Sequence, residues 1–167
     1  MTNKYIYPDT AIFMKPGDVL YSHKTAKSSL IVGHTGIVGE DYNVYHVNWW
    51  GMKGQSDTLA TYLSRHKEGE RLTILRVNDA ETARHAAIWA KKNISKVKHY
   101  SFNLHVNNIE RNYCSKFIWQ AFYYGNQGNI DISQRGLLNN SRRYITPFRI
   151  HKYFHKIGCF HKNTVGS

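Results

Sequence analysis

Cys114, His34 and His46 carry the side chains in this sequence whose types and order suit acyl chemistry. A cysteine thiolate attacks a carbonyl carbon directly, and a neighbouring imidazole can take the proton of the thiol. A second imidazole can hold the first by a hydrogen bond and fix its tautomer. Together they could attack an amide, ester or thioester and pass through an acyl-enzyme.

Cys114 is the second residue of the segment YCSKFIWQAFYYG, whose apolar residues follow helical spacing up to Gly125. The spacing predicts a helix that begins near Cys114 and ends at that glycine. A thiol in the first turn meets the positive end of the helix dipole, so we expect a lowered thiol pKa. The unpaired backbone N–H of Cys114 could donate to an oxyanion. A buried packing cysteine is the alternative interpretation.

His34 lies in the β-rich stretch GHTGIV, and His46 follows it by 12 residues in the stretch VYHV. The polar residues 40–43 between them predict a hairpin turn, which would bring both imidazoles to one face of a sheet. His34 then suits a general base, and His46 suits a residue that orients it. The alternatives are a half-exposed strand residue for His34 and a satisfied core or surface imidazole for His46.

The surrounding elements predict a mixed fold. A Pro/Gly turn at residues 15–18 leads into a strand from Val19, and RLTILRV at residues 71–77 alternates with period two, as a half-buried strand does. Residues 28–38 fit either a helix start at the serine pair or a strand near Thr35. Residues 80–93 form an Ala-rich helix that Asn78-Asp79 can cap.

Composition indicates a folded chain with a basic surface. Of the 167 residues 41% are hydrophobic and 14% aromatic, which excludes the signature of disorder. The net charge of +12 favours anionic partners such as a lipid surface or an acidic polymer. The opening MTNKYIYPDTAIF lacks signal-peptide features and no stretch is apolar enough to span a bilayer, so we expect a soluble protein.

Two other features could carry chemistry. Cys114 and Cys159 are too few for a disulfide framework, and we expect free thiols, with one bridge as the alternative. His151 and His155 would share one face of a helix that runs through Lys156, near His161. Because no carboxylate or Cys-x-x-Cys partner accompanies these histidines, a solvated basic helix is the better interpretation, and no metal or other cofactor is expected.

The ordered set KPGDVL, GHTGIV, VYHV, YSFNL and YCSKFIWQAF resembles the circularly permuted branch of the NlpC-type papain-like superfamily, the YiiX and YycO group. The resemblance spans about residues 15–122, and in that branch the histidine strand precedes the cysteine helix. It implies an α+β fold in which an antiparallel sheet packs against helices and the nucleophile lies at a helix N-terminus. Residues 1–167 would then form a single permuted papain-like domain.

The same resemblance implies a role for particular residues. Cys114 would be the nucleophile, His34 the base and His46 the residue that orients His34, with Glu40 a weaker candidate for that last role. Members of the group often have Glu at the third position, whereas the lecithin retinol acyltransferase branch has His. Tyr100 matches a tyrosine that lines the cleft in this family, and Tyr113 precedes the nucleophile and could shape the oxyanion site. Both are candidate substrate-binding residues, with core packing as the alternative.

Three functions remain open. The leading hypothesis is a cysteine peptidase or amidase that cleaves cell-wall peptides through a Cys-His-His triad, which would require export or delivery to the wall. The second is a lipid-directed acyltransferase or thioesterase with the same triad, for which Trp49, Trp50 and Met52 could contact an acyl chain. The third is a non-catalytic basic module that binds polyanions, although no motif indicates a specific nucleic-acid partner. The oligomeric state stays open.

Overall fold

The computed structural model describes residues 5–22, 34–47, 53–134 and 142–163. Its main sheet has six antiparallel strands in the order β4-β3-β2-β1-β5-β8. The bounds are β1 Val19–Ser22, β2 His34–Val38, β3 Val44–Val47, β4 Gly54–Asp57, β5 Arg71–Arg76 and β8 His155–His161. A second, parallel pair joins β6 His99–Tyr100 to β7 Arg111–Asn112.

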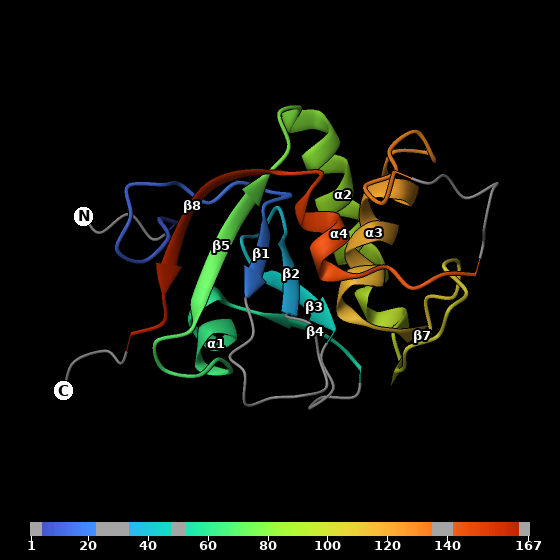
Figure 1. Ribbon diagram of the computed structural model, residues 1–167, viewed down its shortest axis with the longest axis horizontal. Helices are drawn as coiled ribbons and strands as arrows, with labels where there is room; N and C mark the ends of the chain where they lie inside the picture. Colours follow the sequence, from blue (N-terminus) through green and yellow to red (C-terminus); the bar gives the residue numbers. More distant parts are fainter. Residues whose placement is uncertain (1–4, 23–33, 48–52, 135–141, 164–167) are drawn as a thin grey trace.

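Helices cover both faces of this sheet (Figure 1). They are α1 Leu59–Ser64, α2 Ala80–Asn93 with the 3₁₀ turn Ile94–Lys96, α3 Cys114–Gly125 and α4 Pro147–His151. The side chains of Thr58, Asp79 and Thr146 accept backbone hydrogen bonds at the starts of α1, α2 and α4, which satisfies N–H groups that lack helical partners. The α+β architecture expected from the sequence is therefore confirmed.

Strand alternation divides the core into two clusters, one on each face of the sheet. The α3-side core includes Val19 and Ile37 with the apolar face of α3, from Phe117 to Phe122. The α1-side core includes Leu20 and Val38 with Tyr62 of α1. Because successive residues of β2 point to opposite faces, neighbouring side chains on this strand belong to different halves of the molecule.

Gly36 in β2 shapes the α1-side core. A Cβ atom at this position would lie 2.7 Å from a methyl carbon of Val44 and 3.2 Å from the hydroxyl oxygen of Tyr62. A larger residue would push Tyr62 away from the strand, so the glycine permits the close approach of that ring. The register pairs Gly36 with His46 on β3, which brings Tyr62 next to the histidines.

Several predicted elements agree with the structure. The strand from Val19, the hairpin of β2 and β3, the strand from Arg71 and the helix over residues 80–93 are confirmed. So is the helix from Cys114 to Gly125. Of the two interpretations of residues 28–38, the strand near Thr35 is confirmed, whereas residues 28–33 lie outside the described ranges. Cys114 and Cys159 are both free.

The predicted basic helix that carries both His151 and His155 is wrong in its second half. Helix α4 ends at His151, and His155 begins β8, so the two histidines do not share a helical face. β8 forms a ladder with β5 and buries Phe160 in the α1-side core. Backbone hydrogen bonds to the sheet edge and burial of this phenylalanine outweigh the helical spacing of the histidines.

Candidate active site

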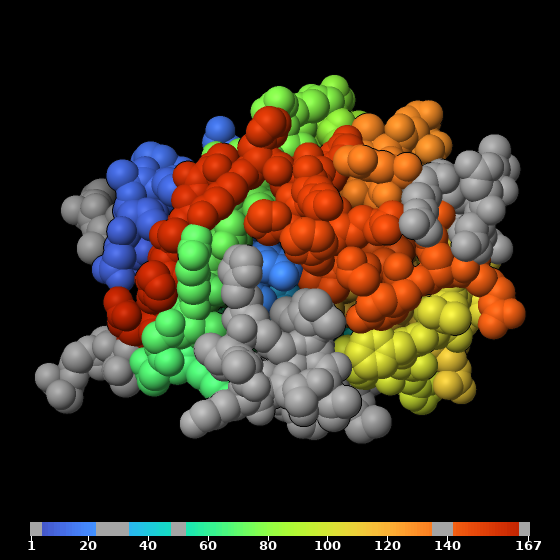
Figure 2. Space-filling model, viewed as in Figure 1, coloured from blue at the N-terminus to red at the C-terminus, as the bar shows by residue number. Residues whose placement is uncertain are grey.

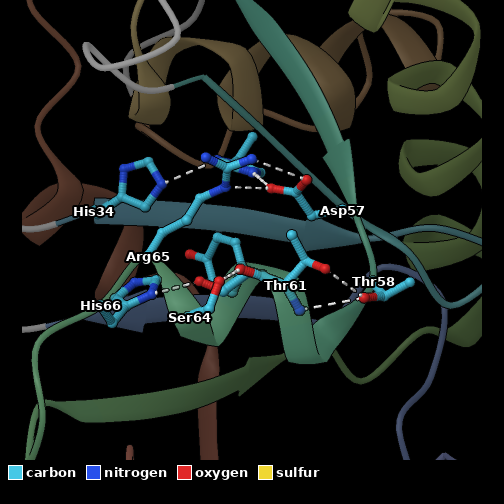
Figure 3. Close-up of polar contacts among 9 residues, drawn as sticks. His34, Asp57, Thr58, Thr61, Ser64, Arg65 and His66 are labelled. Carbon is cyan, nitrogen blue, oxygen red and sulfur yellow. Dashed lines mark hydrogen bonds and ion pairs between the residues drawn. The ribbon is translucent and has the colours of Figure 1, made fainter.

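A chain of polar contacts runs from His34 across the hairpin to α1 (Figure 3). The Nε2 atom of His34 lies 3.4 Å from Nδ1 of His46, and Nε2 of His46 lies 2.7 Å from Oδ2 of Asp57. Arg65, at the C-cap of α1, donates two hydrogen bonds to the same carboxylate, from Nε to Oδ2 at 2.8 Å and from Nη2 to Oδ1 at 3.3 Å. The antiparallel register of β2, β3 and β4 brings these side chains to one face.

The electrostatics of this chain fix its tautomers. Burial acts to raise the pKa of Asp57, but the hydrogen bonds from Arg65 and His46 hold that pKa below its usual value, so the group is a carboxylate. Burial lowers the pKa of His46, and more strongly that of His34, so both rings are neutral near pH 7. A neutral His46 that donates from Nε2 to Asp57 must accept at Nδ1. His34 therefore donates from Nε2, and its Nδ1 carries a lone pair.

Cys114 is the first residue of α3 and is buried. Tyr113, at the N-cap, contributes no side-chain hydrogen bond, so the N–H groups of the first turn are not capped by it. The thiol packs against Thr35 of β2 and Ser115 of α3, whose backbone and hydroxyl groups act on its pKa. Among the described residues, the buried Thr35 hydroxyl has no hydrogen-bond partner other than this thiol.

The expected low thiol pKa is wrong. Burial raises the pKa of Cys114 above its usual value, and this effect exceeds the lowering by the hydrogen bonds of Thr35 and Ser115. The loss of solvent around the sulfur is the largest of these effects. A neutral thiol needs a base to remove its proton during attack, because the neutral histidines form no ion pair with it beforehand.

The thiol and the histidine pair meet β2 at adjacent positions. Thr35 pairs with Tyr21 and faces the α3 side, whereas His34 pairs with Ser22 and faces the α1 side. His34 is the first residue of β2, at the end of the strand (Figure 3). The ring contacts described for His34 are with His46 at 5.5 Å, Tyr62 at 5.9 Å and His66 at 6.0 Å between centroids.

Tyr62 links the two sides electrostatically. Burial raises its pKa well above the usual value, and the charge of a Cys114 thiolate raises it further. The same phenol packs edge-on against His46, with ring centroids 4.9 Å apart. Because Gly36 presents no side chain at this point of the sheet, the Tyr62 hydroxyl can lie close to β2 on the α1 side.

The remaining predicted residues fall in different places. Tyr113 is fully buried, and its hydroxyl accepts the backbone N–H of Ile145 at 2.9 Å, which is a packing role. Tyr100 is half-buried and packs against the α3-side core; burial raises its pKa, and Cys114 adds to the shift. Glu40 lies 3.6 Å from Arg84, away from His34. Residues 49, 50 and 52 lie outside the described ranges.

Asp57, Arg65 and Tyr62 are members of the site that sequence reasoning missed. Asp57 ends the short polar strand GQSD, which lacks the β-branched residues that predict a strand. Its presence after a histidine hairpin was the available signal, because a buried imidazole commonly hydrogen-bonds a carboxylate. Tyr62 and Arg65 belong to a helical segment of six residues and its C-cap, too short for periodicity to identify.

Within the described ranges, no group of three or more His, Cys, Asp or Glu side chains is arranged to hold a metal ion. None of the described helices combines the length and the apolar character needed to cross a bilayer.

Comparisons with known proteins identify the family and the fold. Residues 1–157 match a family model described as "Lipoprotein N-acylation protein LnsA-like". A curated relative, an uncharacterized 30.3 kDa protein of Bacillus thuringiensis, is 25% identical over 145 residues, which are 81% of this chain and 51% of that protein. The chain thus spans about half the length of this relative.

The fold is also that of a solved protein. The crystal structure of the metalloprotein yiiX from Escherichia coli O157:H7 matches with a TM-score of 0.62 and 15% sequence identity, over 86% of this chain and 96% of that chain. This likeness confirms the expected resemblance to the permuted papain-like YiiX group. The description as a metalloprotein applies to the Escherichia coli protein. In the part of this chain that the structure describes, no group of three or more His, Cys, Asp or Glu side chains could hold a metal ion.

Proposed function

The chain belongs to the family of LnsA-like lipoprotein N-acylation proteins, and we propose that it is a thiol-dependent acyltransferase that supplies the acyl group of an N-acylated lipoprotein. The observation that carries the proposal is the chain His34–His46–Asp57, in which two neutral imidazoles lead to a carboxylate. It leaves a lone pair on Nδ1 of His34, next in the strand to Thr35, which contacts the Cys114 thiol. The papain-like fold supports the same assignment, because it pairs a helix-terminal thiol with an imidazole from the sheet.

In the first half-reaction, Cys114 Sγ attacks the carbonyl carbon of an acyl ester while Nδ1 of His34 accepts the thiol proton. The imidazolium that forms is stabilised through His46 by the carboxylate of Asp57. The tetrahedral intermediate collapses with cleavage of the ester bond, and His34 returns the proton to the departing alkoxide. The products are a Cys114 thioester and an alcohol.

In the second half-reaction, an amine attacks the thioester carbon and His34 accepts the ammonium proton. The C–S bond breaks, the thiolate of Cys114 recovers a proton from His34, and an amide is released. We assign the oxyanion of both intermediates to the backbone N–H of Cys114 and the hydroxyl of Thr35. The hydroxyl is suited to this role because it is buried against the thiol and has no other described partner.

The family description supports acyl transfer to a lipoprotein over the leading sequence-based hypothesis of a cell-wall peptidase. Both hypotheses use the same thiol, so the substrate distinguishes them. An acyl-enzyme that forms from a lipid and resolves onto an amine is expected of an acyltransferase. An acyl-enzyme that forms from a cell-wall peptide and resolves onto water is expected of a peptidase.

The test incubates the protein in mixed micelles with a phospholipid and follows its intact mass. We expect one added acyl group on the wild type and none on Cys114→Ala. The matched control is Cys159→Ala, since Cys159 lies on β8, three strands away from β2, and its loss should leave the adduct unchanged. Addition of a diacylglyceryl-cysteine peptide with a free amine should discharge the adduct as an amide.

Three results would contradict the proposal: acyl transfer that persists in Cys114→Ala, an adduct on Cys159, or an adduct that forms with a cell-wall peptide but with no lipid. The last result would restore the peptidase hypothesis with the same nucleophile.

A further inference from the structure

Large apolar side chains are exposed on the α3 side of the molecule, beside the buried thiol. Phe102 is 46% exposed, Leu104 41% and Tyr144 36%. The three lie together, because the N–H of Arg143 donates to the carbonyl of Leu104 at 2.9 Å and the rings of Phe102 and Tyr144 are 5.7 Å apart. Phe148, 58% exposed, follows on α4. We call Phe102, Leu104, Tyr144 and Phe148 the aromatic rim.

The rim is continuous with the surroundings of Cys114. The buried ring of Tyr113, whose residue precedes the nucleophile, lies 5.1 Å from the ring of Tyr144 and 5.5 Å from that of Phe102. Burial raises the pKa of Tyr144, and the charge of Cys114 raises it further, as it also does for Tyr100. An acyl chain that leaves the thiol on this side would therefore meet aromatic rings that are already partly in solvent.

The segments that carry the rim form one face. Residues 99–112 and residues 142–154 are joined by a β-bridge between His105 and Arg142 and lie next to each other in the space-filling view (Figures 1 and 2). Exposed apolar groups gathered at a single face, rather than scattered, indicate a contact surface. The bridge and the hydrogen bond from Arg143 to Leu104 hold the backbone beside Phe102 and Tyr144.

Basic side chains predominate around the rim, where Glu110 is the one carboxylate of residues 99–112. Residues 142–156 contain no Asp or Glu, and three of their basic side chains are exposed: Arg142, Lys152 and Lys156. Arg143 is buried and pairs with Asp131 instead. The ammonium of Lys152 lies 4.8 Å from the ring centroid of Phe148, so a cation and an aromatic ring are presented together. Aromatic rings that enter the headgroup layer beside basic side chains are the combination that binds anionic lipid.

We propose that the aromatic rim docks this protein on the surface of an anionic phospholipid bilayer. The inference rests on the proposed function, since a lipid acyl donor and a lipoprotein acceptor are both held in a membrane. Docking at the rim would place the thiol side of the sheet toward the acyl esters, and the basic side chains would meet the lipid phosphates. The net charge of +12 selects an anionic bilayer over a second copy of this chain, because two such copies repel each other.

The experiment measures cosedimentation with large vesicles, using Cys114→Ala so that no acyl transfer occurs. Vesicles of phosphatidylcholine alone are compared with equimolar phosphatidylcholine and phosphatidylglycerol. We expect binding to the mixed vesicles that weakens as salt is raised, and a partition coefficient about tenfold lower when Phe102→Ser and Phe148→Ser are combined. The matched control is Phe13→Ser, which removes a ring that is 53% exposed in the N-terminal segment and should bind as before.

Equal loss of binding from Phe13→Ser and from the rim variant would overturn the proposal, as would equal binding to both vesicle types. Analytical ultracentrifugation of the same proteins tests whether a second copy of this chain binds the rim instead. If Cys114→Ala is a dimer and the rim substitutions dissociate it, the rim is a self-association surface and the proposal is overturned. Wild-type acyl-enzyme formation from a water-soluble thioester reports separately on the proposed function. If the protein binds vesicles but forms no such adduct, the docking proposal holds and the acyltransferase proposal fails.

Discussion

The two faces of the sheet at the start of β2 differ in how they satisfy their polar groups. On the α1 side, His34, His46, Asp57 and Arg65 form an unbroken chain in which each link is described and each donor has an assigned acceptor. On the α3 side, the thiol of Cys114 is buried beside tyrosines and a threonine hydroxyl. In the proposed reaction, the α1 side would hold the proton and the α3 side would receive the apolar substrate.

The difference suggests that the proposed base and the proposed nucleophile are supported from opposite faces of β2. A base works best when its tautomer is fixed before the substrate arrives, and the carboxylate at the end of the α1-side chain does this without contact with the substrate. A nucleophile that attacks lipid esters benefits from apolar surroundings, although these raise its pKa and make the base necessary. Each face thus supplies what the other lacks, and substitutions on either side test whether they act as one site.

The largest effect is expected from His34→Ala. If Nδ1 of His34 removes the thiol proton, its loss should slow acyl-enzyme formation at Cys114 by about 10²- to 10⁴-fold. Single-turnover mass spectrometry with a soluble thioester measures this rate. The control is His155→Ala, an exposed histidine on β8, which should match the wild type. If the rate for His34→Ala is near that of the control and the thermal unfolding midpoint is unchanged, His34 is not the base for Cys114, and the two faces of the sheet do not act as one site.

A smaller effect is expected from Thr35→Val, which keeps the shape of the side chain and removes the hydroxyl. Loss of one oxyanion donor should lower the acylation rate by about 10²-fold, and Thr35→Ser should restore most of it. Alkylation of Cys114 by iodoacetamide forms no oxyanion, so its rate should stay close to that of the wild type. If alkylation falls as much as acylation, Thr35 acts only by positioning the thiol.

The sequence predicted the hairpin and the cysteine helix because both have local signals. Polar residues 40–43 separate two runs of strand composition, and the apolar face of α3 follows helical spacing. The pairing of His34 with His46 follows from that hairpin alone. These features depend on residues near one another in the chain, where periodicity and turn chemistry are informative.

Other parts of the site depend on contacts that the sequence does not display. The strand of Asp57 exists because β3 pairs with it, and its polar residues carry no β propensity of their own. The pKa of Cys114 depends on how much protein covers the sulfur, so a rule based on the helix dipole alone gave the wrong direction. His155 was assigned to a helix because its spacing from His151 is helical, whereas the edge of β5 recruits it into β8.

The smallest of the three effects is expected from Asp57→Asn, which acts on the base only through His46. The carboxylate raises the pKa of His46 against the lowering by burial, and Arg65 acts to lower it. With a neutral amide in its place, the imidazolium formed during the reaction loses its counter-charge. Because Asp57 acts only through His46, we expect kcat to fall by about tenfold with KM little changed. The reaction requires neutral His34, whose pKa lies well below 6.5, so activity is lost only as pH falls through that lowered value.

Removal of the carboxylate disfavours protonation of both rings, so the acid limb of the pH–rate profile should move to lower pH while the rate on the plateau drops. The matched control is Asp41→Asn, which removes another carboxylate of the same hairpin, also with a lowered pKa, that binds the Tyr45 hydroxyl instead of a histidine. Its acid limb should coincide with that of the wild type. An acid limb that stays in place in Asp57→Asn would mean that the charge on the α1 side does not reach the base. The chain of contacts would then support the fold without tuning the chemistry on the other face.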